Sequence, residues 1–433
     1  MAFGNLNLKT SYPKLKNQIN PQDIENINKI FEPYGLKIDD IKESSQVIRY
    51  IINLPLDSKL QGKIRRAAKD IEYTLTTALN SNDFTYNHAG NRLIIECQGE
   101  LNIVPFGKLY TYNFHAKSKP LSVVLGVDLD GKPIFTDLSK APHMLIAGST
   151  GSGKSETIHA IIASILMHNT FYSPANYIDG RKINAATFID VIDMKGTEYN
   201  KYKNIPQGFT LIRDEIKAFD FIEKLCNEME NRYYLFAQNG CSDIDEYISM
   251  GNKISRRVCI IDEFADLILK NRKIEDNIVR LAQKSRACGI HLIIGTQSPR
   301  AIVITGLIKA NIPLRIALRT SDAMESRIIM DENGAEKLYG KGDMLIKKGG
   351  SKPIRAQGCF VCDEDKENLV KIICSANHNI NPINIDKPKE TPPDTGNYSP
   401  AKKVGFFQGL KNLWNAPPCT TASDYFNIIN NHR

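Results

Sequence analysis

The pattern of hydrophobic and polar positions divides the chain into a shorter α+β segment and a longer α/β segment. Residues 47–56 have an apolar strand pattern, residues 59–80 repeat apolar positions at helical spacing, and residues 91–99 have a second strand pattern. This order predicts a small α+β domain at residues 41–117. From residue 118 to 378, apolar strands alternate with longer helical patterns, which is typical of a mostly parallel sheet covered by helices. The larger domain is therefore predicted to have an α/β fold.

Both ends of the chain are polar. Residues 1–40 are rich in asparagine and are predicted to be a connector with one short amphipathic helix, which begins at Pro21 and ends near Pro33. Residues 379–433 begin with a stretch rich in proline, asparagine and lysine, which cannot bury enough apolar area to offset its ordering entropy. We expect this stretch to be a flexible linker before a short amphipathic tail.

The tail has an apolar face that requires a partner. Residues 402–414 place five large apolar side chains on one side of a helix: Phe406, Phe407, Leu410, Leu413 and Trp414. Packing back onto the larger domain, docking to a recruiting protein and binding a membrane surface all remain open for this face.

Composition adds limits on size, charge and compartment. The chain has 433 residues, of which 42% are hydrophobic and 24% charged, so it can fold into more than one domain. Its net charge of +8 is compatible with a phosphate-rich partner, although charge alone decides little. The nine cysteines are scattered, and Cys259 and Cys288 fall in apolar runs, which argues against an extracellular disulfide framework. With no signal peptide and no membrane-length apolar run, we expect a cytoplasmic protein without a transmembrane segment.

Residues 148–155, GSTGSGKS, match the pattern of a phosphate-binding loop. They follow the apolar residues 144–147 and lead into a helix beginning near Glu156, as this motif requires. Its glycines let backbone N–H groups face phosphates, its lysine reaches the β- and γ-phosphate oxygens, and its final serine ligates Mg²⁺. We therefore predict ATP and Mg²⁺ as cofactors, with the following nucleotide-binding residues: Gly148, Ser149, Thr150, Gly151, Ser152, Gly153, Lys154, Ser155 and Glu156.

Two later strands end in polar residues that would complete such a site. Asp262 and Glu263 follow the apolar residues 258–261, and ligands bind at the carboxyl ends of strands in sheets of this kind. We predict that Asp262 holds Mg²⁺ together with Ser155, and that Glu263 acts on the attacking water. Gln297, after the next apolar strand, could sense the γ-phosphate or serve as an ordinary cap.

These motifs together resemble the FtsK/SpoIIIE-type DNA translocases. The resemblance covers roughly residues 45–375 and is carried by PHMLIAGSTGSGKS, CNEMENRYYLF, IIDEFADL, RLAQKSRACGIHLIIGTQSP and ITGLIKANIPLRIALRTSDAMESRIIMDENGAEKLYGKGDMLI. It implies that residues 118–378 are a RecA-like P-loop ATPase motor domain. It also implies a homo-oligomeric ring, usually a hexamer, that pumps double-stranded DNA through its channel.

The resemblance further implies an arginine that completes the neighbouring subunit's site. Arg286 is the first candidate for this catalytic role and Arg327 the second, although either could be a structural ion-pair partner. Asp193 and Lys195 occupy the place of a similar Asp-Pro-Lys element, with Met194 at the proline position, and we expect them to brace the site.

Cationic and polar channel loops are expected to contact DNA phosphates without reading sequence. The candidates come from two segments: Lys253, Arg256 and Arg257 in the first, and Arg300, Thr305 and Lys309 in the second. Solvated charged loops are the alternative interpretation. The family usually has TQRP where this chain has TQSP at residues 296–299, so its arginine is displaced to position 300.

Comparison with division-type members of the family leaves the biological setting open. The chain lacks recognisable N-terminal membrane helices and a C-terminal winged-helix module, so we expect recruitment by another protein through the tail. We infer a mobile element or phage-like system that transfers or packages DNA. Two alternatives remain: a conjugation coupling protein that moves single-stranded DNA, and an ATP-assembled DNA-binding ring without processive translocation.

A possible zinc pattern lies near the end of the larger domain. Cys359, Cys362, Cys374 and His378 have nearly the spacing of a zinc finger. The same segment resembles the last strand and helix of the motor domain, so we favour core positions for these cysteines.

Overall fold

The structure of the chain is a computed structural model. It describes residues 8–11, 19–79, 84–110, 121–172, 177–178, 181–182, 187–206 and 208–376. The predicted linker and amphipathic tail, together with His378, lie outside the described residues.

The small domain is an antiparallel sheet packed against helices. Its strand order is β1-β2-β4-β3, and its helices include α1, which lies within the predicted connector. Ile27 and Phe31 of α1 are fully buried together with Tyr50 and Leu93 of the sheet. The core of this domain therefore begins at α1. The elements are α1 Pro21–Phe31, η2 Glu32–Tyr34, β1 Asp40–Glu43, β2 Val47–Asn53, α2 Ser58–Arg66, α3 Ala68–Ala78, β3 Phe84–Ala89 and β4 Arg92–Gln98.

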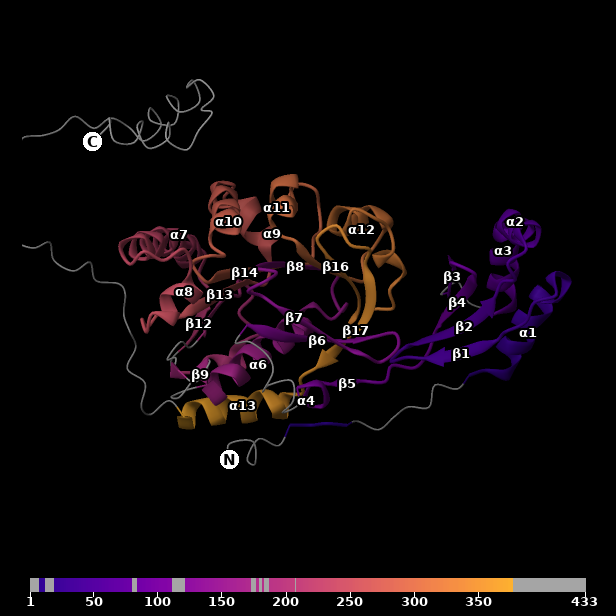
Figure 1. Cartoon of the computed structure of the whole chain (residues 1–433), viewed down its shortest axis with the longest axis horizontal. Coiled ribbons are helices and arrows are strands. Elements are labelled where there is room, and N and C mark those ends of the chain that lie inside the picture. The colour runs from indigo at the N-terminus through magenta and orange to yellow at the C-terminus, as the bar shows by residue number, and fades with distance from the viewer. Residues whose placement is uncertain are drawn as a thin grey trace, which may run out of the picture. The chain divides into compact units, whose positions relative to one another are not determined.

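The large domain is built on one mixed sheet with the strand order β12-β11-β13-β14-β8-β15-β16-β17-β6-β7 (Figure 1). The strands from β12 to β15 run parallel, and those from β16 to β7 are antiparallel to their neighbours. A short strand, β5, pairs in parallel with β17. The strands are β5 Val104–Pro105, β6 Ser122–Asp128, β7 Pro133–Asp137, β8 His143–Ala147, β11 Thr187–Ile192, β12 Phe209–Ile212, β13 Arg256–Ile261, β14 Ile290–Thr296, β15 Leu314–Leu318, β16 Asp343–Lys348 and β17 Ile354–Phe360; β9 Tyr177–Ile178 and β10 Arg181–Lys182 form a separate pair.

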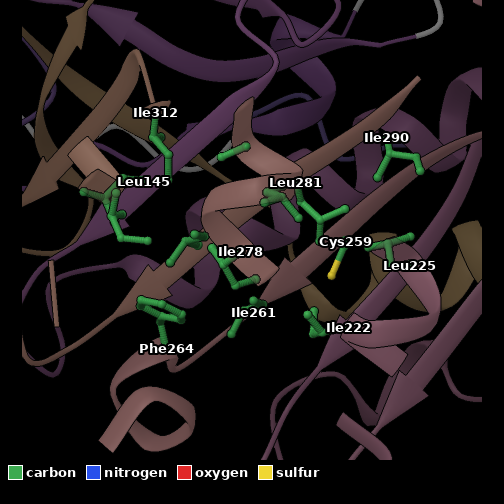
Figure 2. Packing of buried hydrophobic residues seen from close by; sticks show 14 of the residues in the cluster. Leu145, Ile222, Leu225, Cys259, Ile261, Phe264, Ile278, Leu281, Ile290 and Ile312 are labelled. Atoms are coloured by element: carbon green, nitrogen blue, oxygen red, sulfur yellow. The ribbon is translucent and has the colours of Figure 1, made fainter. Parts of the chain in front are cut away.

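Helices cover both faces of this sheet, so its strands are buried on two sides. Along β13, Ile261 packs in a cluster with residues of α7 and α10, whereas Ile260 packs with residues of α6. Figure 2 shows the first cluster, in which Leu145, Ile261, Phe264 and Ile278 converge. The helices are α4 Phe106–Leu109, α6 Lys154–Tyr172, η3 Asn200–Tyr202, α7 Glu215–Gln238, α8 Ile244–Ser249, α9 Phe264–Lys270, α10 Lys273–Lys284, α11 Gly306–Asn311, α12 Ala323–Met330, η4 Ala335–Lys337 and α13 Asp363–Ala376.

Side-chain contacts connect the small domain to the large one. Arg355 on β17 forms ion pairs with Glu96 of β4 at 2.6 Å and with Asp343 of β16 at 2.7 Å. Gln46, which immediately precedes β2, donates from Nε2 to the Gly340 carbonyl at 2.9 Å. The small domain is therefore joined to the loop between η4 and β16.

The cysteines of the possible zinc pattern can be located among the described residues. Cys359 lies on β17 and Cys374 on α13, as the resemblance to the last strand and helix of the motor domain implied. The expected core position holds for Cys359, which is buried, whereas Cys362 and Cys374 are only half-buried. In the described ranges, no group of three or more histidine, cysteine, aspartate or glutamate side chains could hold a metal ion. No helix within those ranges is long and apolar enough to cross a membrane.

Candidate nucleotide-binding site

The P-loop, residues 148–153, connects β8 to α6 at the carboxyl edge of the parallel strands. Ser149 donates from its backbone N–H and its hydroxyl to the Arg319 carbonyl, at 2.8 and 2.9 Å. Gly342 donates its N–H to the Ser152 carbonyl at 2.7 Å. The loop is therefore held by chain segments beyond β15 and before β16.

Lys154 and Asp262 form a buried ion pair beneath the loop. Lys154 Nζ donates to Asp262 Oδ1 at 2.8 Å and also to the main-chain carbonyl of Asp262. The Tyr199 hydroxyl donates to the same carboxylate oxygen at 2.9 Å. Burial, followed by the nearby charge of Asp262, raises the pKa of Tyr199 well above its usual value, so the hydroxyl remains a donor.

Glu263 is held by the end of the neighbouring strand β14. Thr296 Oγ1 donates to Glu263 Oε1 at 2.6 Å, and the Gln297 N–H donates to Oε2 at 2.9 Å. The side-chain oxygen of Gln297 accepts a hydrogen bond from Thr150 Oγ1 of the P-loop at 2.9 Å. Gln297 therefore connects the carboxylate to the phosphate-binding loop.

A cavity of about 470 Å³ opens over the P-loop. One part is polar, with the loop residues, Lys154 and Ser155, and another is apolar, with Leu101, Val104 and Phe360. Pockets of this size accommodate small organic ligands. Its two kinds of wall suit a ligand with a phosphate chain and an aromatic base.

Glu156, at the start of α6, also lines the cavity and pairs with Lys366 of α13 at 3.4 Å. Burial raises the pKa of Glu156, while the Lys366 charge opposes this increase. The pair connects α13 to the first turn of α6.

The residues at the site fit Mg²⁺ in its usual setting with phosphates. Ser155 supplies a hydroxyl oxygen to the cavity, and Asp262 supplies a carboxylate beside Lys154. Mg²⁺ prefers oxygen ligands, and it commonly uses one or two protein groups together with substrate phosphates and water.

The structure brings together the predicted nucleotide-binding and catalytic residues except Arg286. Arg286 precedes β14, at the sheet edge opposite the P-loop, and donates from Nε to the Ser139 carbonyl at 3.2 Å. Arg327 lies on α12 and donates from Nε to Asn333 Oδ1 at 2.6 Å. Both arginine residues are exposed.

Most cations of the first predicted DNA-binding segment form internal contacts. Arg256 is buried and pairs with Asp245, and Arg257 pairs with Asp190 and Glu228, both at 3.0 Å. Lys253 is exposed. We therefore keep only Lys253 from this segment as an interface candidate.

In the second predicted DNA-binding segment, two side chains form internal contacts and one is exposed. Thr305 caps α11 and donates to Glu275 at 2.6 Å, and Lys309 pairs with Asp331 at 2.7 Å. Arg300 is exposed after β14. Lys253 precedes a parallel strand and Arg300 follows one, so the two lie at opposite edges of the sheet.

Sequence reasoning overlooked several residues of the site. Tyr199 carried no motif, although it follows the predicted bracing residues Asp193 and Lys195 closely in sequence. Asp193 is buried and accepts the Gly196 N–H at 2.9 Å, whereas Lys195 is exposed. The apolar wall at Leu101 and Val104 and the Glu156–Lys366 pair had no recognisable sequence signal.

Comparisons with known proteins agree with this geometry. Residues 109–301 match the model of the FtsK/SpoIIIE family. The DNA translocase SftA of Bacillus subtilis (strain 168) is 44% identical over 271 residues, which are 60% of this chain and 27% of that protein. The DNA translocase FtsK of Halalkalibacterium halodurans is 42% identical over 267 residues, which are 58% of this chain and 32% of that protein. The chain thus spans about a third of the length of these relatives.

Solved structures share the fold. The conjugation coupling protein TcpA of pCW3, in a monomer form with ATPγS, superposes with a TM-score of 0.54 at 26% identity. That match covers 82% of this chain and 99% of TcpA. The cytoplasmic domain of the type VII secretion ATPase EccC from Thermomonospora curvata gives a TM-score of 0.50 at 20% identity, over 59% of this chain and 31% of that chain. The predicted RecA-like P-loop ATPase fold is thereby confirmed, and residues 109–301 are similar to the FtsK/SpoIIIE family.

Proposed function

We propose that this chain is an ATP-driven translocase that assembles into a ring and moves double-stranded DNA. One observation carries the proposal: a complete P-loop lies over the Lys154–Asp262 pair, with Glu263 beside it on the same sheet edge. Relatives named DNA translocases share this region at 42–44% identity. Nucleotide hydrolysis and DNA movement are the functions that this combination supports best.

The chemistry follows from the positions of the side chains. Phosphates bound on the loop amides attract Lys154 away from Asp262 toward the β/γ oxygens. Ser155 and Asp262 would hold Mg²⁺, which would neutralise charge on the phosphates. Glu263, fixed by Thr296 and Gln297, accepts a hydrogen bond from the attacking water and orients it.

The same proposal assigns roles to exposed groups. Arg286, or else Arg327, reaches the γ-phosphate of the neighbouring subunit in the ring, since neither lies at the nucleotide site of its own subunit. Lys253 and Arg300 contact DNA phosphates without reading sequence. A recruiting protein binds the tail, and the motor serves DNA transfer or packaging by a mobile element.

Steady-state ATP hydrolysis by the purified full chain tests this proposal. Rates are measured without DNA, with single strands and with long duplex, at low and moderate salt. We expect strong stimulation by duplex that fades as salt rises, because phosphate contacts release counterions. Equal rates in all three conditions would contradict DNA as the cargo.

Glu263→Gln separates hydrolysis from nucleotide binding in this assay. Loss of the carboxylate should lower turnover by about 10²-fold or more while ATP still binds. Asp266→Asn is the matched control, because Asp266 is an acid in the first turn of α9, the helix that follows Glu263, and has no bond to Thr296 or Gln297. Unchanged turnover of Glu263→Gln would exclude its proposed role.

A conjugation coupling protein is the second candidate function. It is favoured by the superposition on TcpA, which covers 99% of that chain. Greater stimulation of hydrolysis by single-stranded DNA than by duplex would support this candidate over the first.

A further inference from the structure

Lys341 lies at the cavity in an uncommon backbone conformation. Its φ of 50° is in the left-handed region, and the flanking Gly340 and Gly342 have φ values of 82° and 92°. A residue with a Cβ rarely adopts this conformation unless surrounding contacts hold it there. A lysine between two glycines in this loop therefore needs an explanation.

Contacts with the P-loop hold the backbone on both sides of Lys341. Gly342 donates its N–H to the Ser152 carbonyl at 2.7 Å, and a Cβ added to Gly153 would lie only 2.5 Å from the Gly342 nitrogen. On the other side, a Cβ added to Gly340 would lie 3.9 Å from the Gly151 carbonyl oxygen. The backbone on both sides of Lys341 therefore lies directly against the phosphate-binding loop.

Two glutamine side-chain amides bind the backbone of the loop that contains Lys341. Gln357 Nε2 donates to the Lys341 carbonyl at 2.9 Å, and Gln46 Nε2 donates to the Gly340 carbonyl at 2.9 Å. These contacts fix the backbone, whereas the Lys341 side chain is exposed and lines the cavity.

Lys341 differs from the other lysines around this site because those lysines form ion pairs with carboxylates. Lys154 pairs with Asp262, and Lys366 pairs with Glu156. Within the part of the chain that the structure describes, no carboxylate forms an ion pair with Lys341. The cavity therefore has a cation that remains available for an anionic ligand.

We propose that the Lys341 ammonium binds phosphate oxygens of the nucleotide held by the same subunit's P-loop. The inference rests on the nucleotide binding proposed above and adds a second lysine to the phosphate site. A flexible lysine side chain acts as a point charge, so it can follow the phosphate chain without strict geometry. Lys341 then raises the affinity for ATP and ADP.

Lys341→Gly is the most informative substitution. Glycine favours the observed φ, so the variant should fold at least as well as the wild-type chain. Equilibrium binding of ADP and ATPγS to the full-length chain should weaken about tenfold. Lys341→Arg keeps the positive charge and should restore most of the affinity.

Lys352→Gly is the matched control. Lys352 is an exposed lysine in the β16–β17 turn and does not line the cavity, so its removal should leave nucleotide affinity unchanged. Weakening restricted to ATPγS would assign the contact to the γ-phosphate, and equal weakening for ADP would assign it to the inner phosphates.

Several outcomes would overturn the inference. Unchanged ADP and ATPγS affinity in Lys341→Gly would do so, as would an equal loss in Lys352→Gly. Weaker DNA binding with unaltered nucleotide affinity would assign Lys341 to DNA instead. If the wild-type chain bound neither nucleotide, the proposed function itself would fail, and the Lys341 contact with it.

Discussion

Asp262 accepts hydrogen bonds from Lys154 Nζ at 2.8 Å and from the Tyr199 hydroxyl at 2.9 Å on a single carboxylate oxygen. The carboxylate is almost completely buried, so each donor replaces hydration that the charge has lost. In the proposed mechanism phosphates draw Lys154 away from Asp262, and Tyr199 is then the donor that continues to orient the carboxylate. We therefore expect Tyr199 to have a positioning role that acts through Asp262.

Tyr199→Phe should lower both stability and turnover. Loss of one buried hydrogen bond to a charged group costs about 1.5–3 kcal/mol in the free energy of unfolding, and a less fixed Asp262 should slow ATP hydrolysis. Denaturant unfolding and steady-state hydrolysis measure the two effects. Tyr202→Phe is the control, because its hydroxyl contacts His159 Nδ1 at 3.2 Å and not Asp262. Equal turnover in the two variants would contradict the positioning role.

The P-loop packs closely against the backbone of residues 339–343. Gly153 has a φ of 109°, and its missing Cβ leaves room for the backbone of Gly342. Gly151 also has a positive φ, of 77°, but an added Cβ would have no atom within 4 Å. Both glycines therefore have a positive φ, but only Gly153 is packed against another part of the backbone.

Gly153→Ala should be far more damaging than Gly151→Ala. At Gly151 the substitution adds only backbone strain, about 1–2 kcal/mol, whereas at Gly153 it also displaces the Gly342 backbone. We expect Gly153→Ala to weaken ADP binding and to lower the unfolding midpoint more than Gly151→Ala does. Calorimetry of both variants with and without ADP measures this. A smaller effect at Gly153 would show that the two segments are not in close contact.

At the scale of the molecule, a buried charge connects the two domains. Arg355 bonds Glu96 of the small domain and Asp343 of the large one, and its guanidinium lies 4.9 Å from the Tyr339 ring centre. Asp343 in turn accepts the Tyr339 N–H at 2.9 Å. Removal of Arg355 would leave two nearly buried carboxylates without their cation.

Arg355→Ala should lower the free energy of unfolding by about 3–5 kcal/mol, as expected when one partner of a buried ion pair is lost. Lys29→Ala is the comparison, since it breaks the exposed Lys29–Glu25 pair and should lower the free energy of unfolding far less than Arg355→Ala does. Urea unfolding of both variants tests the difference. Similar costs in the two would mean that the Arg355 pairs contribute little.

Buried histidines make the stability of the large domain depend on pH. Burial, the largest cause, lowers the pKa of His143 and His159 to about 3 and of His291 to about 4, from an ordinary value of 6.5. His143 Nδ1 accepts the Leu292 N–H at 3.0 Å, a bond that requires the neutral ring. The unfolded chain therefore binds more protons than the folded chain at pH values between about 4 and 6.5.

The free energy of unfolding should accordingly be greatest above pH 6.5 and should fall as the pH decreases below that value. Each of the three histidines should cost about 1 kcal/mol between pH 7 and pH 5.5. Urea unfolding at the two pH values measures the loss, and His291→Asn should reduce it by about a third. An unfolding free energy that is equal at both pH values would contradict the buried, neutral state of these rings.

The chain's local patterns determined the parallel sheet, the phosphate-binding motif from Gly148 to Ser155, and the positions of Asp262 and Glu263. Each of these depends on neighbours within a few residues, because period, turn glycines and strand ends are properties of short segments. The same patterns predicted a connector at residues 1–40, whereas packing places part of it, α1, in the small domain's core.

Only the tertiary structure decided which long-range partners complete the site and which cations are already used. Tyr199 meets Asp262 across 63 positions, Ser149 meets the Arg319 carbonyl across 170, and Arg257 pairs with Asp190 across 67. Such contacts arise from the order of strands in the sheet and from the loops that follow them, which no local spacing encodes. Arg256 and Arg257 read as surface charges in the sequence because the carboxylates that neutralise them are brought close only by folding.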